Sequence, residues 1–256
     1  MLEIVTVPAL EVFDNYYFLI RDTDTGKTAA VDCGGAAPVL AALEARGWDL
    51  DEIWITHHHW DHVGGVAGLK AETAARVRGT RHAAPNMPPL DEDLPQEGSF
   101  RFGAHEVQVL HVPGHANGHI AFYIPSADAL FSGDSLMALG CGRLIEGTAE
   151  EMWTSLTRLR ALPRETMVYS GHEYTLGNAR FAATIEPGNA ALKARIAEVE
   201  SLRAEGKPTV PSSLGLECDT NPFLRADTAS VKSALDMADA PDVAVFAEIR
   251  ARKDRF

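Results

Sequence analysis

Four histidines and one aspartate lie within a six-residue segment, His57-His58-His59-Trp60-Asp61-His62, directly after an apolar, strand-like run. In an extended backbone alternate side chains point the same way, so His57 and His59 would face one metal ion while His58 points away. Asp61 and His62 can then turn toward a second ion. Imidazole and carboxylate without thiolate suit zinc, iron or manganese at a catalytic site that keeps a position open for water. The alternatives are a chance cluster of histidines on a surface loop or a patch that scavenges transition metals, and this specific spacing disfavours both.

Three further candidate ligands lie downstream, and each follows a strand-like run. His115 lies in Pro113-Gly114-His115, Asp134 in Phe131-Ser132-Gly133-Asp134, and His172 in Ser170-Gly171-His172. Because open α/β sheets place their sites at the ends of their strands, these side chains could converge on the histidine-rich segment. The pattern therefore predicts one metal centre built from several distant parts of the chain.

The elements that must position these residues alternate between strands and helices, which is typical of a layered α/β domain. After Ser170 no further strand is expected, and a helical domain begins near residue 173. Two Pro-rich or Gly-rich segments, 82–98 and 207–222, are expected as an exposed excursion and as a connection between helices. The expected strands are Leu2–Val7, Tyr16–Ile20, Thr28–Val31, Glu52–Ile55, Val107–Val112, Ile120–Ile124, Leu130–Ser132 and Met167–Tyr169, and the expected helices are Ala37–Arg46, Glu150–Leu162, one from Asn189, Ala229–Met237 and Asp242–Arg252.

The composition of the chain argues against several classes of function. The chain has 256 residues and a net charge of −13, so a phosphate backbone would be repelled and nucleic acid is not expected as a partner. Its three cysteines are far apart, which favours a reducing compartment. The first residues include Glu3, Glu11 and Asp14 and resemble no secretory signal, and no apolar run is long enough for a membrane span. A cytoplasmic protein without a membrane partner is expected.

The histidine-rich segment and its downstream partners resemble the metallo-β-lactamase superfamily, and further stretches resemble its glyoxalase II family, the hydroxyacylglutathione hydrolases. The likeness covers nearly the whole chain. It implies a four-layer αββα sandwich over residues 1–172, followed by a smaller all-helical C-terminal domain over residues 173–256 that forms the glutathione side of the cleft. The stretches are Gly140-Cys141-Gly142-Arg143, Glu146-Gly147-Thr148, Gly171-His172-Glu173-Tyr174-Thr175, Glu186-Pro187-Gly188-Asn189, Asn221-Pro222-Phe223, and an ending with Arg250, Lys253, Asp254 and Phe256.

The resemblance also implies the ligand set and the reaction. Two divalent ions per chain are expected, zinc in the first place and iron or manganese as alternatives. A hydroxide held between them would attack the thioester of an S-(2-hydroxyacyl)glutathione, S-D-lactoylglutathione being the usual substrate of the family. Asp61 and Asp134 would be the catalytic carboxylates. The implied ligands are His57, His59 and His115 for the first ion, Asp61, His62 and His172 for the second, and Asp134 as the bridge.

Four residues match family positions that contact glutathione: Arg143, Tyr174, Arg250 and Lys253. Residues 246–256 carry four basic and two acidic side chains on an otherwise acidic chain, which fits an anionic ligand. A basic helix end that complements its own dipole is an equal reading of that charge when it is taken alone. Ile145 stands where the family usually places an aromatic residue, which puts glutathione affinity in question but not the chemistry.

Several conspicuous residues are expected to have supporting roles. His58 and His119 are interpreted as hydrogen-bonded structural histidines, since the ligand set is filled without them. Asp32 is interpreted as a support for the metal loop, although an aspartate before Gly-Gly is also common turn chemistry. Cys141 has no evident base and is not expected to be a nucleophile. His82, His105 and His111 are expected to be ordinary surface or strand residues.

The sequence also allows other functions. One is another hydrolase of the superfamily, acting on a β-lactam or a lactone, which the helical domain and the Arg143 stretch disfavour. A second is a single-iron glutathione persulfide dioxygenase, which the joint presence of Asp61, His62 and His172 disfavours. A nuclease would need a basic track that the sequence lacks. A noncatalytic metal-binding module is least expected because every implied ligand is present. A monomer is expected.

Overall fold

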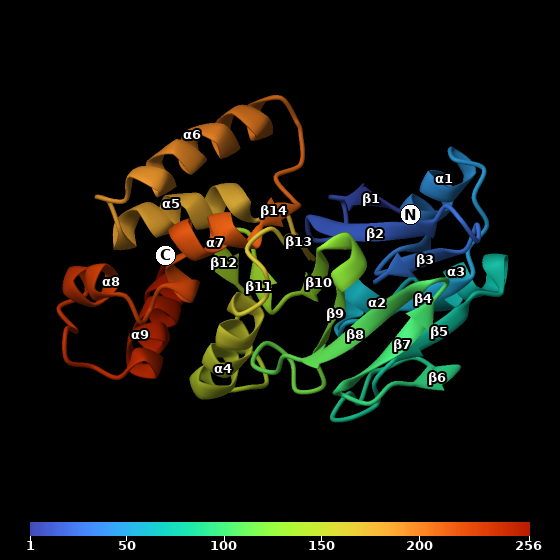
Figure 1. The fold of residues 1–256 in the computed structure, drawn as a ribbon, viewed down its shortest axis with the longest axis horizontal. Coiled ribbons are helices and arrows are strands. Elements are labelled where there is room, and N and C mark those ends of the chain that lie inside the picture. Colours follow the sequence, from blue (N-terminus) through green and yellow to red (C-terminus); the bar gives the residue numbers. More distant parts are fainter.

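Two six-stranded sheets form the centre of the computed structural model, which describes residues 1–256 (Figure 1). The strand order is β1-β2-β3-β4-β5-β6 in one sheet and β14-β13-β10-β9-β8-β7 in the other, and β11 and β12 form a separate hairpin. The strands are β1 Leu2–Ala9, β2 Asn15–Asp22, β3 Thr28–Val31, β4 Glu52–Trp54, β5 Arg76–Gly79, β6 Glu92–Asp93, β7 Gly98–Phe102, β8 His105–His111, β9 Ile120–Ile124, β10 Ala129–Gly133, β11 Leu136–Met137, β12 Gly140–Cys141, β13 Met167–Ser170 and β14 Ser212–Ser213.

Helices flank both sheets, and those of the last third of the chain gather at one end of the molecule, in orange and red in Figure 1. The α-helices are α1 Ala36–Glu44, α2 Trp60–Val63, α3 Val66–Thr73, α4 Ala149–Arg160, α5 Thr175–Ile185, α6 Ala190–Ala204, α7 Leu214–Thr220, α8 Ala229–Ala234 and α9 Asp242–Arg255, with short 3₁₀ turns at Pro125–Ala127 and Pro222–Leu224. None of these helices has the length and apolar character required to cross a bilayer.

The residue alternation in β2 shows how the layers form. Successive side chains of a strand point to opposite faces. Phe18 and Ile20 therefore pack between the two sheets in a cluster that includes Trp54, whereas Tyr17 and Leu19 pack on the other face in the cluster that α1 and α3 complete. Both faces of β2 are buried, as expected for a strand with a sheet on one side and helices on the other. The predicted αββα sandwich is confirmed.

The outer face of the second sheet is covered by helices from two parts of the chain. Leu130 on β10 shares one buried cluster with Leu156 of α4 and with Phe246 and Ile249 of α9. Helix α4 begins with a capping box in which Thr148 and Glu151 satisfy each other's backbone amides. The C-terminal helices thus complete the hydrophobic core of the sandwich.

The expectation that no strand follows Ser170 is wrong. Ser212 and Ser213 form β14, which pairs antiparallel with Val168 and Met167 and extends the second sheet by one strand. A two-residue strand shows no hydrophobic alternation, so periodicity could not reveal it. The 82–98 segment also contributes β6, and β5, β7, α5 and α7 are further elements that the pattern did not predict.

Candidate metal centre

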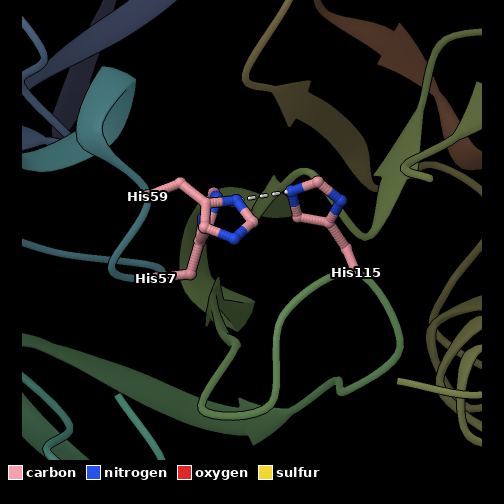
Figure 2. A group of neighbouring side chains, drawn as sticks. All are labelled: His57, His59 and His115. Atoms are coloured by element: carbon pink, nitrogen blue, oxygen red, sulfur yellow. Dashed lines mark hydrogen bonds between the residues drawn. The ribbon is translucent and has the colours of Figure 1, made fainter. Parts of the chain in front are cut away.

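The histidine-rich segment lies where β4 ends and the short helix α2 begins. His57 and His59 extend from this loop toward His115, which comes from the loop between β8 and β9 (Figure 2). The ligand atoms of these three residues all lie within 4.8 Å of one another. His59 Nδ1 is 2.9 Å from His115 Nε2. The structure therefore brings together the three ligands expected for the first ion.

A second cluster lies beside the first. Asp61 and His62 are on α2, and His172 follows β13. The ligand atoms of these residues also lie within 4.8 Å of one another, with Asp61 Oδ2 3.3 Å from His172 Nε2 and 3.5 Å from His62 Nε2. These are the residues expected to hold the second ion.

Asp134, which directly follows β10, contacts both clusters. Its Oδ2 lies 3.0 Å from His172 Nε2 and 3.5 Å from His115 Nε2. Its Oδ1 lies 3.4 Å from His62 Nε2. Asp134 is therefore placed between the two clusters, as the predicted bridging role requires.

The residues present fit a pair of bound cations. His57 Nε2, His62 Nε2 and Asp134 Oδ1 are buried atoms without a hydrogen-bond partner of good geometry. Buried polar atoms are nearly always paired in folded proteins, so three such atoms in one place indicate a missing partner. The same three residues form a group whose ligand atoms lie within 4.8 Å of one another. Nitrogen and carboxylate oxygen are the donors that divalent transition metals take.

The electrostatics of the two clusters differ. Burial lowers the pKa of His57 and of His115, so these imidazoles are neutral, as a ligand must be. Burial would also lower the pKa of His62 and His172, but the charge of Asp134 and the hydrogen bonds to neighbouring carboxylates together outweigh burial and raise both pKa values to about 10. Burial would raise the pKa of Asp61, yet the hydrogen bond from His172 and the charge of His62 lower it to about 2. The second cluster therefore attracts positive charge.

Further residues orient the ligands through hydrogen bonds to the ligands and to the loop that carries them. Asp32, at the end of β3, accepts hydrogen bonds from Thr56 N and Thr56 Oγ1, both at 2.8 Å, and lies 2.9 Å from His62 Nδ1. With the proton on Nδ1, His62 presents Nε2 to the cluster. His119 Nε2 accepts from the backbone N–H of Asp134 at 3.1 Å, and its ring stacks on His57. These contacts agree with the supporting roles predicted for Asp32 and His119.

A cleft of about 690 Å³ opens above the clusters, and the four predicted glutathione contacts, Arg143, Tyr174, Arg250 and Lys253, line it together with His59, Asp61, His115, Asp134 and His172. Lys253 donates to Gly177 O at 3.1 Å, and burial together with the charges of Arg250 and Arg143 lowers its pKa to about 8. Tyr174 stacks on His172. Ile145 is 59% exposed at the cleft, so the departure from an aromatic residue lies in the wall itself.

Arg250 differs from the other three, because it is only 5% exposed. Its Nη1 donates to Cys141 O at 3.0 Å, and its Nε and Nη2 donate to Asp254 Oδ1 at 3.0 and 2.7 Å. The guanidinium thus joins α9 to the β11–β12 hairpin. Burial raises the pKa of the Cys141 thiol to about 11, which agrees with the expectation that it is no nucleophile.

Two residues at the site have roles that the sequence did not predict. Phe13, in the turn between β1 and β2, accepts hydrogen bonds through its carbonyl from His172 Nδ1 at 2.9 Å and Tyr174 Oη at 3.1 Å. Its φ of 53° is in the left-handed region, and the following Asp-Asn pair was the only sequence signal for such a turn. Glu146, the second, lies against His58 and His59, each at 3.1 Å. Its position in a family-like stretch was the only sign of a role.

Comparison with known proteins agrees with the fold. Residues 10–172 match the family model for the metallo-beta-lactamase superfamily. ETHE1 from Myxococcus xanthus superposes with a TM-score of 0.67 at 24% identity, covering 98% of each chain. The protein TTHA1623, solved in a di-iron-bound form, has a TM-score of 0.61 at 28% identity and covers 86% of this chain and 98% of its own. Residues 10–172 therefore belong to the metallo-β-lactamase superfamily.

Residues 173–256 show to which family within the superfamily the chain belongs. Residues 173–256 match the model for the hydroxyacylglutathione hydrolase C-terminus. Hydroxyacylglutathione hydrolase from Ruegeria pomeroyi is 56% identical over 255 residues, covering 100% of this chain and 99% of the relative. The protein of the same name from Methylococcus capsulatus is 54% identical over 256 residues, with the same coverage. The chain belongs to the hydroxyacylglutathione hydrolase family.

Proposed function

We propose that this protein is a thioester hydrolase that cleaves S-(2-hydroxyacyl)glutathione, in the first place S-D-lactoylglutathione, to glutathione and a 2-hydroxy acid. The observation that carries the proposal is the position of Asp134, between two ligand clusters and at the cleft that Arg143 and Lys253 line. One cleft thus combines a place for two cations with positive side chains for an anionic thioester. The names of the relatives that match the full chain support the same substrate class.

Two divalent ions would be held by His57, His59 and His115 on one side, by Asp61, His62 and His172 on the other, and by Asp134 between them. We propose zinc, with iron or manganese as alternatives, and the di-iron form of TTHA1623 supports a site of this kind. When bound, such ions supply Lewis-acid chemistry and lower the pKa of water to near neutrality.

The chain's own residues orient the reactants. The side chain of Asp61 is 20% exposed at the cleft, so its carboxylate can orient the attacking water, while Asp134 fixes the ligands of both clusters. The sulfur of glutathione leaves as a thiolate, which is stable enough to need no acid from the protein. Cys141 takes no part, because burial keeps its thiol protonated.

The remote carboxylates of glutathione would be bound by Arg143, Lys253 and Arg250, with Tyr174 as a further contact. Charged hydrogen bonds to carboxylates are stronger than neutral ones, and they position the thioester by its far end. Residues 1–172 would then be the catalytic part and residues 173–256 the glutathione-binding part. We propose that the protein works as a monomer in the cytoplasm, and its free cysteines, two of them buried, support a reducing compartment.

The test measures thiol release from S-D-lactoylglutathione by the purified, metal-loaded protein, beside hydrolysis of a β-lactam and of an acyl-lactone. Oxygen consumption with glutathione persulfide is measured in parallel. Rapid thiol release with the other activities at least a hundredfold lower is the expected result. Faster lactone or β-lactam hydrolysis, or oxygen consumption with the persulfide, would replace the proposal with the corresponding alternative.

A further inference from the structure

Glu146 lies in the loop between β12 and α4 and faces two histidine rings. Its Oε1 is 3.1 Å from His58 Nε2 and 3.1 Å from His59 Nε2. Its Oε2 accepts the backbone N–H of Asn117 at 3.0 Å. Both carboxylate oxygens are therefore used, and the side chain is only 24% exposed.

The contact with His59 determines which of its nitrogens carries the proton. A neutral imidazole has one N–H donor and one acceptor nitrogen. A carboxylate can only accept, so the proton must be on Nε2, and the lone pair is left on Nδ1. Nδ1 is the atom that faces His115 Nε2 at 2.9 Å within the first cluster. Glu146 thus directs the ligand atom of His59 toward the first ion.

The same loop also holds His115. Its Nδ1 donates to Arg143 O at 2.9 Å, and its backbone carbonyl accepts from Glu146 N at 3.3 Å. The second cluster depends on other parts of the chain, because His62 is held by Asp32 and His172 by Phe13 O. A defect in the loop should therefore affect the first ion and spare the second.

We propose that Glu146 is a positioning residue that fixes the tautomer of His59 and thereby sets the affinity of the first metal ion. The inference rests on the proposed metal centre and is independent of the thioester. A wild-type protein that binds no metal would refute the proposed function, whereas a wild-type protein with two ions and an unchanged Glu146 variant would refute this inference alone.

The experiment compares zinc affinities of Glu146→Ala, Glu146→Gln and the wild type by competition with a chelator that resolves two successive ions. We expect one dissociation constant to rise about 10- to 100-fold in Glu146→Ala and the other to change less than threefold. Glu146→Gln keeps one acceptor oxygen, which must serve either the two histidines or the backbone N–H of Asn117, so an intermediate effect is expected. This variant replaces Glu146→Ala if the alanine variant fails to fold. Equal changes at both ions, or none, overturn the proposal.

Glu151→Gln is the matched control. Glu151 lies just beyond the same loop and accepts the backbone N–H of Thr148 at 2.7 Å, but it contacts no ligand. Its variant should leave both zinc affinities within threefold of the wild type. The ring ¹⁵N signals of His59 give a second readout: an Nε2–H tautomer in the wild type and loss of its fixed tautomer in the metal-free Glu146→Ala protein. An Nδ1–H tautomer in the wild type would contradict the proposal.

Discussion

The carboxylate of Asp134 lies within 3.5 Å of ligand atoms from both clusters. Asp134→Ala should therefore reduce the bound metal from two ions to one or none, and should lower kcat/KM by roughly a thousandfold or more, since both halves of the site lose a ligand. Metal analysis and thiol-release kinetics check this. His111→Asn, outside the clusters, is the control and should retain two ions. A variant of Asp134 that keeps both ions would show that the bridging assignment is wrong.

Lys253 provides a pH dependence of substrate binding. Its pKa of about 8 means that it is charged below pH 8 and neutral above. Because the proposed partner is a carboxylate, KM should be lowest below pH 8 and rise about tenfold or more by pH 10, with kcat little changed. Lys253→Arg keeps its charge and should remove the rise. A wild-type KM that is flat to pH 10 would place the glutathione anchor elsewhere.

Among individual residues, the sequence predicted the metal ligands best and the residues that hold these ligands in place least. Histidines and an aspartate in a compact segment after a strand carry a strong signal. Glu146 reaches His59 across 87 positions of the chain, and Phe13 acts through its backbone carbonyl, so neither contact has a local pattern. Arg250 was predicted as a glutathione contact, and the structure adds a bond to Cys141 O that no periodicity could reveal.

A buried ion pair connects three elements next to the cleft. Arg195 of α6 binds Glu217 of α7, and Glu217 also accepts the backbone N–H of Leu139 in the β11–β12 hairpin at 2.9 Å. Glu217→Gln removes the buried negative charge and leaves Arg195 unpaired, so the free energy of unfolding should fall by about 3 kcal/mol. Urea denaturation measures this.

The exposed pair between Arg164 and Asp219 of α7 is the control for Glu217. Both side chains are more than half exposed, so Asp219→Asn should change the free energy of unfolding by less than about 1 kcal/mol. An equal loss of unfolding free energy in the two variants would mean that the buried pair stabilises the protein no more than the exposed pair does. Most strands and the long helices α4, α6 and α9 could be predicted because they repeat a buried face. The strands β5 and β7 and helix α5 were missed, and α7 and β14 are too short to show a repeated face.

The two parts of the chain share one hydrophobic core, with Leu130 and Leu156 on one side of residue 172 and Phe246 and Ile249 on the other. A fragment of residues 1–172 should therefore expose apolar surface, bind a hydrophobic dye and lack a fixed near-ultraviolet circular dichroism signal. The full chain should unfold in one cooperative transition. A fragment with a native-like spectrum and its own sharp transition would contradict this expectation. The sequence could suggest a boundary near residue 172 but not how much core crosses it.

Two glycines determine where this catalytic cleft can change during evolution. A Cβ on Gly171 would lie 2.5 Å from Asp134 Oδ1, and one on Gly142 would lie 2.8 Å from His115 Nδ1. A side chain at either position would displace a ligand, so glycine is required at both. Phe13 and Ile145, at the rim, are 65% and 59% exposed and line the same cleft. Laboratory selection for bulkier acyl groups should therefore accumulate substitutions at the rim and leave both glycines untouched.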